Sequence, residues 1–174
     1  MTTLDVRPLT SRPDYERVCD YFLTADPAYL RGMGVDATKL LPRDEWLARP
    51  LADHERPDRD KQLCYVGWYV DDELVGHSSI NKIVYGVEAY IHLHLWRAES
   101  RRAGAGTELF RRSANYFRRR FELARLYCEP WAENPAPNRV LAKLGFRLDK
   151  RYRTVPGLNH FEQDVNRYVI DRDI

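Results

Sequence analysis

Two histidines, His92 and His94, stand two positions apart in a segment of alternating character, residues 90–96. Alternate side chains of a β-strand point to the same face, so these histidines share a face with Tyr90 and Trp96, and branched apolar residues form the other. Imidazole changes charge near neutral pH and can accept a proton during a reaction. The segment indicates either catalytic histidines or two core histidines on a strand with two buried faces.

A glycine-rich stretch, residues 101–107, follows this strand and precedes a long helical pattern. Gly104 and Gly106 allow a ligand to approach the backbone where a side chain would block it. Backbone N–H groups converge at such a turn, the helix N-terminus adds its positive dipole end, and Arg101 and Arg102 can add charge-assisted hydrogen bonds. The stretch predicts a phosphate site, with a plain strand-to-helix turn as the alternative.

Composition limits the class of protein. The 174 residues suit a single domain, residues 1–174, and 28 basic against 26 acidic residues leave a net charge of +2. We therefore expect no general attraction to nucleic acid. Without a membrane-length apolar run or a signal peptide, we expect a cytoplasmic protein with no membrane partner. Cys19, Cys64 and Cys128 lack disulfide or metal spacing and are expected to be buried thiols.

Apolar periodicity predicts an α/β chain whose strands and helices position these groups. Helices are expected after Ser11, which forms an N-cap with Asp14, after Pro42, after the glycine stretch and after Pro135. Seven strands are expected at residues 4–9, 63–70, 74–84, 90–96, 123–129, 146–155 and 164–170. The second to fourth strands form an antiparallel meander, and the helix between the fourth and fifth makes that pair parallel.

Two connecting segments complete this outline. Residues 29–34 carry two glycines among large apolar side chains, which predicts a loop that can act as a mobile lid. The polar run 53–61 predicts a solvated connection.

Two motifs together resemble those of the GNAT superfamily of N-acetyltransferases. One is the R-x-x-G-x-G stretch ending at Gly106, and the other is N-x-x-x-x-R-x-x-x-K-x-G-F over residues 134–146. The first follows the fourth strand and the second follows the fifth, the two places where that family carries them. The second motif is most similar to the branch of the ribosomal-protein N-terminal acetyltransferases, which also acetylates small amines and antibiotics.

The resemblance implies a mixed, mostly antiparallel seven-stranded sheet flanked by helices, with strands four and five splayed. It also implies acetyl-CoA as co-substrate in that splay, without a metal. The pyrophosphate is expected on the glycine stretch, the acetyl and pantetheine groups on the backbone of residues 95–97, and the remaining contacts on the second motif. The implied cofactor residues are Leu95, Trp96, Arg97, Arg101, Arg102, Ala103, Gly104, Ala105, Gly106, Thr107, Asn134, Asn138 and Arg139.

The chain departs from the family pattern at two positions. Many relatives carry a tyrosine on the second-motif helix to protonate the leaving thiolate, and Leu141 stands there instead. The serine that the ribosomal branch often carries near the start of that helix is Pro137. A tyrosine from elsewhere, or water, is expected to supply the proton.

The implied reaction is direct attack by a primary amine, of a small molecule or a protein N-terminus, in a ternary complex. Since amines titrate near 8 or above, a base is needed, and we expect His92 to accept the proton with His94 and Glu129 as its support. Glu129 acting through a water, or in a salt bridge, is an alternative. The acceptor-facing residues are expected to be Tyr29, Met33, Trp46 and Tyr90. Cys128 is expected to be a core residue, not a nucleophile.

An arginine face on the helix after the glycine stretch suggests a different class, a CoA-binding module or a nucleic-acid or ribosome-binding module, without turnover. Such stripes are usually solvated, and no aromatic residues for base stacking are interleaved here. We therefore do not expect a nucleic-acid partner, and we expect a monomer or a homodimer. The face comprises Arg111, Arg112, Arg118, Arg119 and Arg120.

Overall fold

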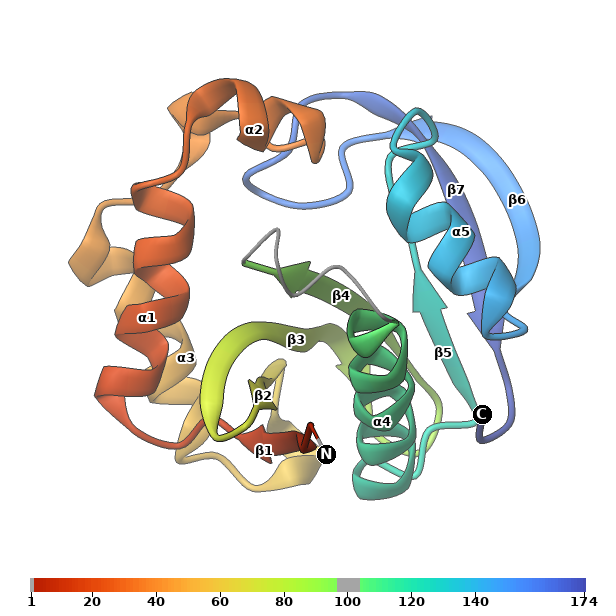
Figure 1. Ribbon diagram of the computed structural model, residues 1–174, viewed down its shortest axis with the longest axis horizontal. Helices are drawn as coiled ribbons and strands as arrows, with labels where there is room; N and C mark the ends of the chain where they lie inside the picture. Colours follow the sequence, from red (N-terminus) through yellow and green to blue (C-terminus); the bar gives the residue numbers. More distant parts are fainter. Residues whose placement is uncertain (1, 97–103) are drawn as a thin grey trace.

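The computed structural model describes residues 2–96 and 104–174, which form one seven-stranded sheet with helices on both faces (Figure 1). The strands are β1 (Leu4–Pro8), β2 (Leu63–Val70), β3 (Glu73–Val84), β4 (Glu88–Leu95), β5 (Arg125–Cys128), β6 (Arg147–Thr154) and β7 (Gln163–Ile170). The helices are α1 (Arg12–Leu23), α2 (Pro27–Gly32), α3 (Arg43–His54), α4 (Ala105–Arg120) and α5 (Pro135–Lys143). Two 3₁₀ turns, η1 (Ala37–Lys39) and η2 (Asp58–Asp60), lie in the connections.

The strand order is β1-β2-β3-β4-β5-β7-β6, and every neighbouring pair is antiparallel except β4 and β5. The parallel pairing of β4 with β5 runs only from Glu88 opposite Arg125 to Tyr90 opposite Tyr127. β4 continues to Leu95 without that partner, and Figure 1 shows the two strands diverging. The predicted mixed sheet with splayed central strands is confirmed.

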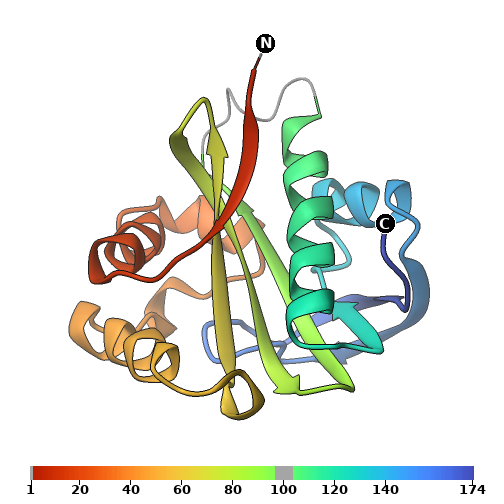
Figure 2. The ribbon, with the colours of Figure 1, turned by 90° about the horizontal axis from the view of Figure 1, so that it is seen from below.

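The sheet is covered by α4 on one face and by α1 and α3 on the other (Figure 2). The apolar side of α4 is fully buried, and the indole of Trp68 on β2 donates a 2.8 Å hydrogen bond to Ser113 Oγ. Trp46 and Leu47 of α3 pack with Tyr15 and Val18 of α1. Both layers follow from the 3.6-residue spacing of these apolar side chains.

The predicted N-cap of α1 is present. Asp14 N donates to Ser11 Oγ at 3.3 Å, and the Asp14 carboxylate accepts from Ser11 N at 3.1 Å, which completes a capping box. This reciprocal pair satisfies backbone donors that the first turn of a helix leaves free.

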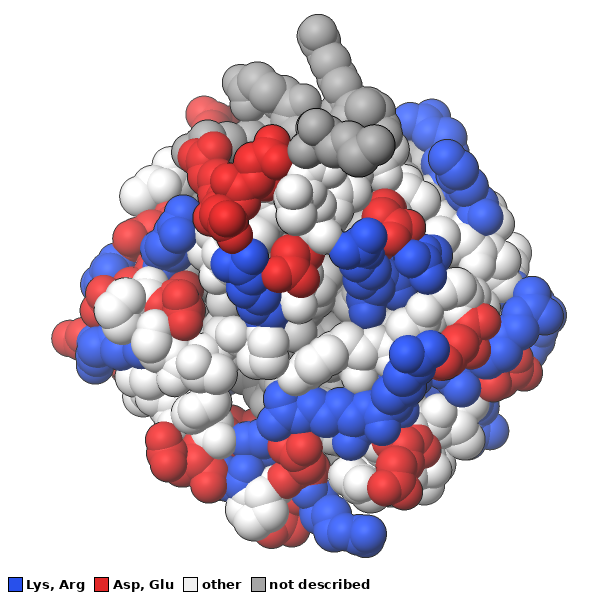
Figure 3. All heavy atoms as spheres, turned by 60° about the horizontal axis from the view of Figure 1, so that its bottom comes forward, with Lys and Arg blue, Asp and Glu red and all other residues white. Residues whose placement is uncertain are grey.

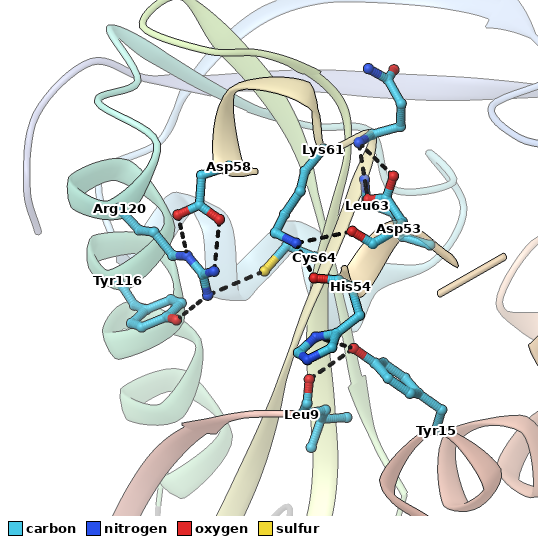
Figure 4. Close-up of polar contacts among 11 residues, drawn as sticks. Leu9, Tyr15, Asp53, His54, Asp58, Lys61, Leu63, Cys64, Tyr116 and Arg120 are labelled. Atoms are coloured by element: carbon cyan, nitrogen blue, oxygen red, sulfur yellow. Dashed lines mark hydrogen bonds and ion pairs between the residues drawn. The ribbon is translucent and has the colours of Figure 1, made fainter. Parts of the chain in front are cut away.

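The prediction of a solvated connection over residues 53–61 is wrong at its two ends, because Asp53 and Lys61 are buried. The Asp53 carboxylate accepts backbone N–H bonds from Gln62 and Leu63, and Lys61 Nζ donates to the carbonyls of Asp53 and His54 (Figure 4). Two charged side chains thus satisfy the last carbonyls of α3 and the backbone amides at the start of β2.

The loop predicted at residues 29–34 is also wrong, since α2 occupies most of it. The Asp26 carboxylate accepts from Ala28 N and Tyr29 N, and Pro27 stands in the first helical turn. The Asp-Pro pair therefore begins a helix as well as ending the previous one. Only Gly34, with φ of 84°, takes a left-handed conformation in this segment.

The three cysteines are free and buried, as expected from their spacing. Burial raises the pKa of the Cys128 thiol, which keeps it protonated at neutral pH. Within the described ranges, no helix has the length and apolar character needed to cross a bilayer.

Candidate active site

A cavity of about 940 Å³ opens where β4 and β5 separate. Its lining comes from α1, α2 and α3, from β2, β3 and β4 of the sheet, from the first turn of α4, from the segment after β5 with α5, and from the β6–β7 connection. The loss of pairing beyond Tyr90 therefore creates the space in which the predicted site residues meet.

The start of α4 forms one end of the cavity. Gly104 is the N-cap residue with φ of 77°, a left-handed conformation that favours glycine, and Gly104, Gly106 and Thr107 line the space. A Cβ at Gly106 would lie 3.3 Å from Leu95 Cδ2, so a larger side chain at this position would have to displace Leu95. The first N–H groups of α4, including that of Ala105, have no acceptor within the helix, as a phosphate cradle requires.

The other predicted cofactor residues, apart from Trp96, divide into three groups. Leu95, Asn134 and Arg139 line the cavity, and the side chain of Asn134 makes no capping bond to α5. The side-chain amide of Asn138 already has hydrogen-bond partners within the protein, since it donates to the carbonyls of Trp131 and Asn134 and accepts from Asn166. Arg97, Arg101, Arg102 and Ala103 lie outside the described residues.

Trp96 and Leu141 are both committed to internal contacts. The backbone N–H of Trp96 donates to Val75 O at 2.9 Å, so it is not free to act as a donor to an acetyl carbonyl. Leu141 is fully buried in the core under α5 and carries no proton to give a leaving thiolate.

His92 faces the cavity and is held by one polar partner. Its Nε2 lies 3.1 Å from Asn81 Oδ1, and because an amide oxygen only accepts, Nε2 donates and Nδ1 keeps a free lone pair. Removal from bulk water lowers the pKa of His92 to about 4, with smaller contributions from the charges of His160 and Lys82. At neutral pH His92 is therefore neutral and able to accept a proton.

His94 shares the cavity with a histidine that the sequence reasoning missed. His77 on β3 stands opposite His94 in the strand register, and their rings stack with centroids 4.8 Å apart. Trp96 Nε1 donates to His77 Nδ1 at 2.9 Å, while His94 Nδ1 has no partner among the described residues. Desolvation lowers the pKa of His94 to about 3 and that of His77 well below its usual value. The register of the predicted meander was the available signal for His77.

Glu129, directly after β5, lines the cavity and accepts a short hydrogen bond from the hydroxyl of Tyr152 on β6. No hydrogen bond joins Glu129 to either predicted histidine in the part of the chain that the structure describes. Desolvation and the Glu129 carboxylate together raise the pKa of Tyr152. The predicted support therefore shares the cavity with His92, but its direct partner is Tyr152, which sequence spacing did not indicate.

Three of the four predicted acceptor-facing residues, Tyr29, Met33 and Trp46, line the cavity. The fourth, Tyr90, lies outside the lining and stacks on Tyr127 with ring centroids 5.3 Å apart. Tyr21 of α1 joins the first three, because its hydroxyl lies 3.1 Å from that of Tyr29 and donates to the sulfur of Met33.

The segment around α2 contacts the connection between β6 and β7 and the start of β7. Val35 forms an isolated bridge with His160, Asp36 N donates to Asn159 O, and the Gln163 side chain donates to Gly34 O at 2.8 Å. Figure 1 shows α2 beside the connection between β6 and β7. This side of the cavity is thus a wall built from two segments distant in sequence.

Comparison with known proteins agrees with this geometry. A family model described as an acetyltransferase (GNAT) domain matches residues 3–147. No curated protein matches the chain.

Three solved structures illustrate the shared fold, each over nearly the whole of both chains. RimL, described as a ribosomal L7/L12 alpha-N-protein acetyltransferase in complex with coenzyme A, has 20% identity and a TM-score of 0.78, covering 98% of this chain and 95% of that one. A spermidine N-acetyltransferase from Vibrio cholerae with CoA and spermine has 18% identity and a TM-score of 0.76, covering 96% and 94%. YncA, a putative acetyltransferase from Salmonella typhimurium with acetyl-CoA, has 14% identity and a TM-score of 0.72, covering 97% and 93%.

The family model spans most of the chain. Gly104 and Gly106 lie at the start of α4 after β4, and the second motif forms α5 after β5, the two places that the resemblance implies. The chain belongs to the GNAT family of acetyltransferases.

Proposed function

We propose that this protein transfers the acetyl group of acetyl-CoA to a primary amine by direct attack in a ternary complex. The observation that carries the proposal is the cavity itself, which joins the first turn of α4 to the histidine face of β4 in one space. The described part of the glycine turn fits a phosphate, since the first N–H groups of α4 have no acceptor within the helix and neither Gly104 nor Gly106 carries a side chain that would obstruct one.

The cofactor contacts we propose follow the lining. The pyrophosphate lies on the N–H groups of residues 104–107, with Arg101 and Arg102 adding charge. The pantetheine arm runs between β4 and β5 past Leu95, Asn134 and Arg139. The acetyl group then reaches the segment of β4 that carries His92.

The proposed chemical step uses His92 as the base. The amine nitrogen attacks the thioester carbonyl, its proton passes to His92 Nδ1 directly or through a water, and the carbon–sulfur bond breaks. Asn81 keeps Nε2 as the donor nitrogen, which leaves Nδ1 as the basic one. With Leu141 in place of a tyrosine, the thiolate takes its proton from water or from another tyrosine.

Roles for the remaining polar groups follow from their contacts. His94 stacks on His77 and positions the strand face, and Glu129, held by Tyr152, receives the incoming amine. Tyr29, Met33 and Trp46 form the acceptor side of the cavity. The solved neighbours support an amine acceptor in general terms, since RimL is described as acting on a protein N-terminus and the Vibrio cholerae enzyme as acting on spermidine.

The arginine face of α4 gives no support to a nucleic-acid module. Arg111 and Arg112 pair with Glu108, Arg119 with Asp173, and Arg120 with Asp58. Figure 3 shows Lys and Arg interspersed with Asp and Glu on this side of the molecule. A binding surface for a polyanion would need basic side chains that are not already neutralised by neighbours.

The test of the proposed function is release of free thiol from acetyl-CoA in the presence of a panel of amines, peptides and aminoglycosides. We expect thiol release that depends on at least one amine and yields its N-acetyl product by mass spectrometry. Binding of acetyl-CoA without amine-dependent thiol release across the panel would contradict the proposal.

A further inference from the structure

Aromatic rings form a large part of the acceptor side of the cavity. We call the residues that form it the aromatic wall: Tyr21, Phe22, Tyr29, Trp46 and Tyr65, together with the imidazoles of His77 and His94, all of which line the cavity. Its rings form a continuous series, with centroids 6.2 Å apart from Trp46 to Tyr65, 5.9 Å from Tyr65 to His77 and 4.8 Å from His77 to His94. Phe22 and Tyr21 then contact His94 at 5.1 and 5.7 Å.

The wall is electrically neutral at physiological pH. Desolvation lowers the pKa of His94 to about 3 and that of His77 well below 6.5, so neither imidazole takes up a second proton and neither carries a charge. His77 Nδ1 must keep its lone pair to accept the bond from Trp96 Nε1. Desolvation likewise raises the pKa of Tyr65, which keeps its hydroxyl protonated. The histidines therefore present uncharged ring faces.

Charged groups around the cavity are unevenly distributed. Among the described lining residues Glu129 is the one carboxylate, against the cations Arg49, Arg139 and Lys143. Arg139 and Lys143 lie on α5, on the cofactor side. Arg49 lies on α3, one helical turn after Trp46, and no described carboxylate pairs with it. The acceptor side thus offers one negative charge near the reaction and a positive charge beside the wall.

We infer that the preferred acceptor is a primary amine attached to an aromatic body and carrying no second positive charge. This inference rests on the proposed function and specifies its substrate class. A single ammonium is attracted to Glu129 and to aromatic faces before it loses its proton, and the aromatic body gains edge-to-face and stacking contacts with the wall. A polyamine would bring further ammonium groups close to the positive charge of Arg49. Among the described lining residues no further carboxylate could pair with them, so the cost of removing these ammonium groups from water would not be compensated.

The closing experiment compares specificity constants by thiol release with product analysis. The amines are 2-phenylethylamine, tryptamine, n-butylamine and spermidine at constant ionic strength. We expect the aromatic amines to exceed both butylamine and spermidine in kcat/KM by about tenfold or more, which is the scale of one or two aromatic contacts. A kcat/KM for spermidine equal to or above that for the aromatic amines would overturn the inference while leaving the proposed function standing.

Two variants and a control sharpen this result. Arg49→Glu, compared with Arg49→Gln, should move the ratio of kcat/KM for spermidine over tryptamine upward by about threefold or more, because it adds a carboxylate beside the wall. Tyr29→Ala should raise KM for tryptamine about fivefold with little change for butylamine, since butylamine makes no ring contact. An unchanged ratio in Arg49→Glu, or equal KM changes in Tyr29→Ala, would contradict the inference.

The failure of the proposed function has a different signature. Acetyl-CoA would still raise the melting temperature, but no amine in the panel would release thiol. In that case both the proposed reaction and the proposed substrate class would be contradicted.

Discussion

The two ends of the cavity are built in different ways. The end that we propose for acetyl-CoA, called the cofactor end, is formed by local backbone turns, one at the start of α4 and one before α5, each contained in a short motif. The end that we propose for the amine, called the acceptor end, is formed by contacts between distant segments, such as His77 against His94, Glu129 against Tyr152 and Gly34 against Gln163. A backbone site depends on which residue types stand next to each other in the chain, whereas a side-chain site depends on strand register and packing.

The largest effect is expected from the cofactor end. Gly106→Trp places an indole where even a Cβ comes within 3.3 Å of Leu95, so it should remove acetyl-CoA binding. Acetyl-CoA at a hundredfold over its Kd should stabilise the unaltered protein by roughly 2.7 kcal/mol, measured as a thermal shift, and the variant should lose that shift. Gly106→Ala is the matched control, because the flexible Leu95 side chain can yield to one methyl group. An undiminished shift in Gly106→Trp would place the cofactor elsewhere.

Low pH should lower the free energy of unfolding through His92 on β4. The folded-state pKa of His92, about 4, lies below its value near 6.5 in an unfolded chain. The unfolded state therefore binds more protons between these values, and stability is lost as pH falls from 6.5 toward 4. The loss should be about 2 kcal/mol for His92.

Urea denaturation near neutral pH and at about pH 4.5 measures this change. His92→Gln should show a correspondingly shallower pH dependence, because its side chain takes up no proton. An identical dependence in the variant would show that His92 is not the proton-linked group.

A smaller effect should separate Glu129 from a purely structural carboxylate. Tyr152→Phe removes the hydroxyl that donates to Glu129 and should lower kcat/KM for the amine about threefold to tenfold, which corresponds to the roughly 0.5–1.5 kcal/mol net contribution of a typical hydrogen bond. KM for acetyl-CoA should hold. Tyr85→Phe is the matched control, since Tyr85 donates at 2.7 Å to Glu122 outside the cavity lining. Equal losses in the two variants would mean that Glu129 has no special part in the reaction.

The difference between the two ends also explains which parts of the structure could be predicted from the sequence. Periodicity and glycine placement, which are local properties, predict all seven strands, the parallel pair and the glycine turn at the start of α4. The helix α2 was missed because Asp26 and Pro27 suit both the end of one helix and the beginning of the next.

The missed site residues share one cause. His77 and Tyr152 contact partners on other strands, and nothing in their immediate sequence neighbours indicates those contacts.

Asp53 and Lys61 were expected in water, yet both are buried because each satisfies backbone groups at a helix-to-strand junction. Hydrophilic composition alone therefore does not place a side chain at the surface.

The central claim is that the two ends meet at His92, whose Nδ1 takes the amine proton. The most direct measurement is the pH dependence of kcat for His92→Ala beside the unaltered protein and His94→Ala, with acetyl-CoA binding checked by thermal shift. Loss of a general base should lower kcat by about 10² or more, with a smaller loss in His94→Ala. The unaltered protein should keep His92 active down to about pH 4, since protonation below that value abolishes the base. If folded His92→Ala that binds acetyl-CoA keeps kcat within about threefold at every pH, His92 is a core residue and Glu129 acting through water is the base.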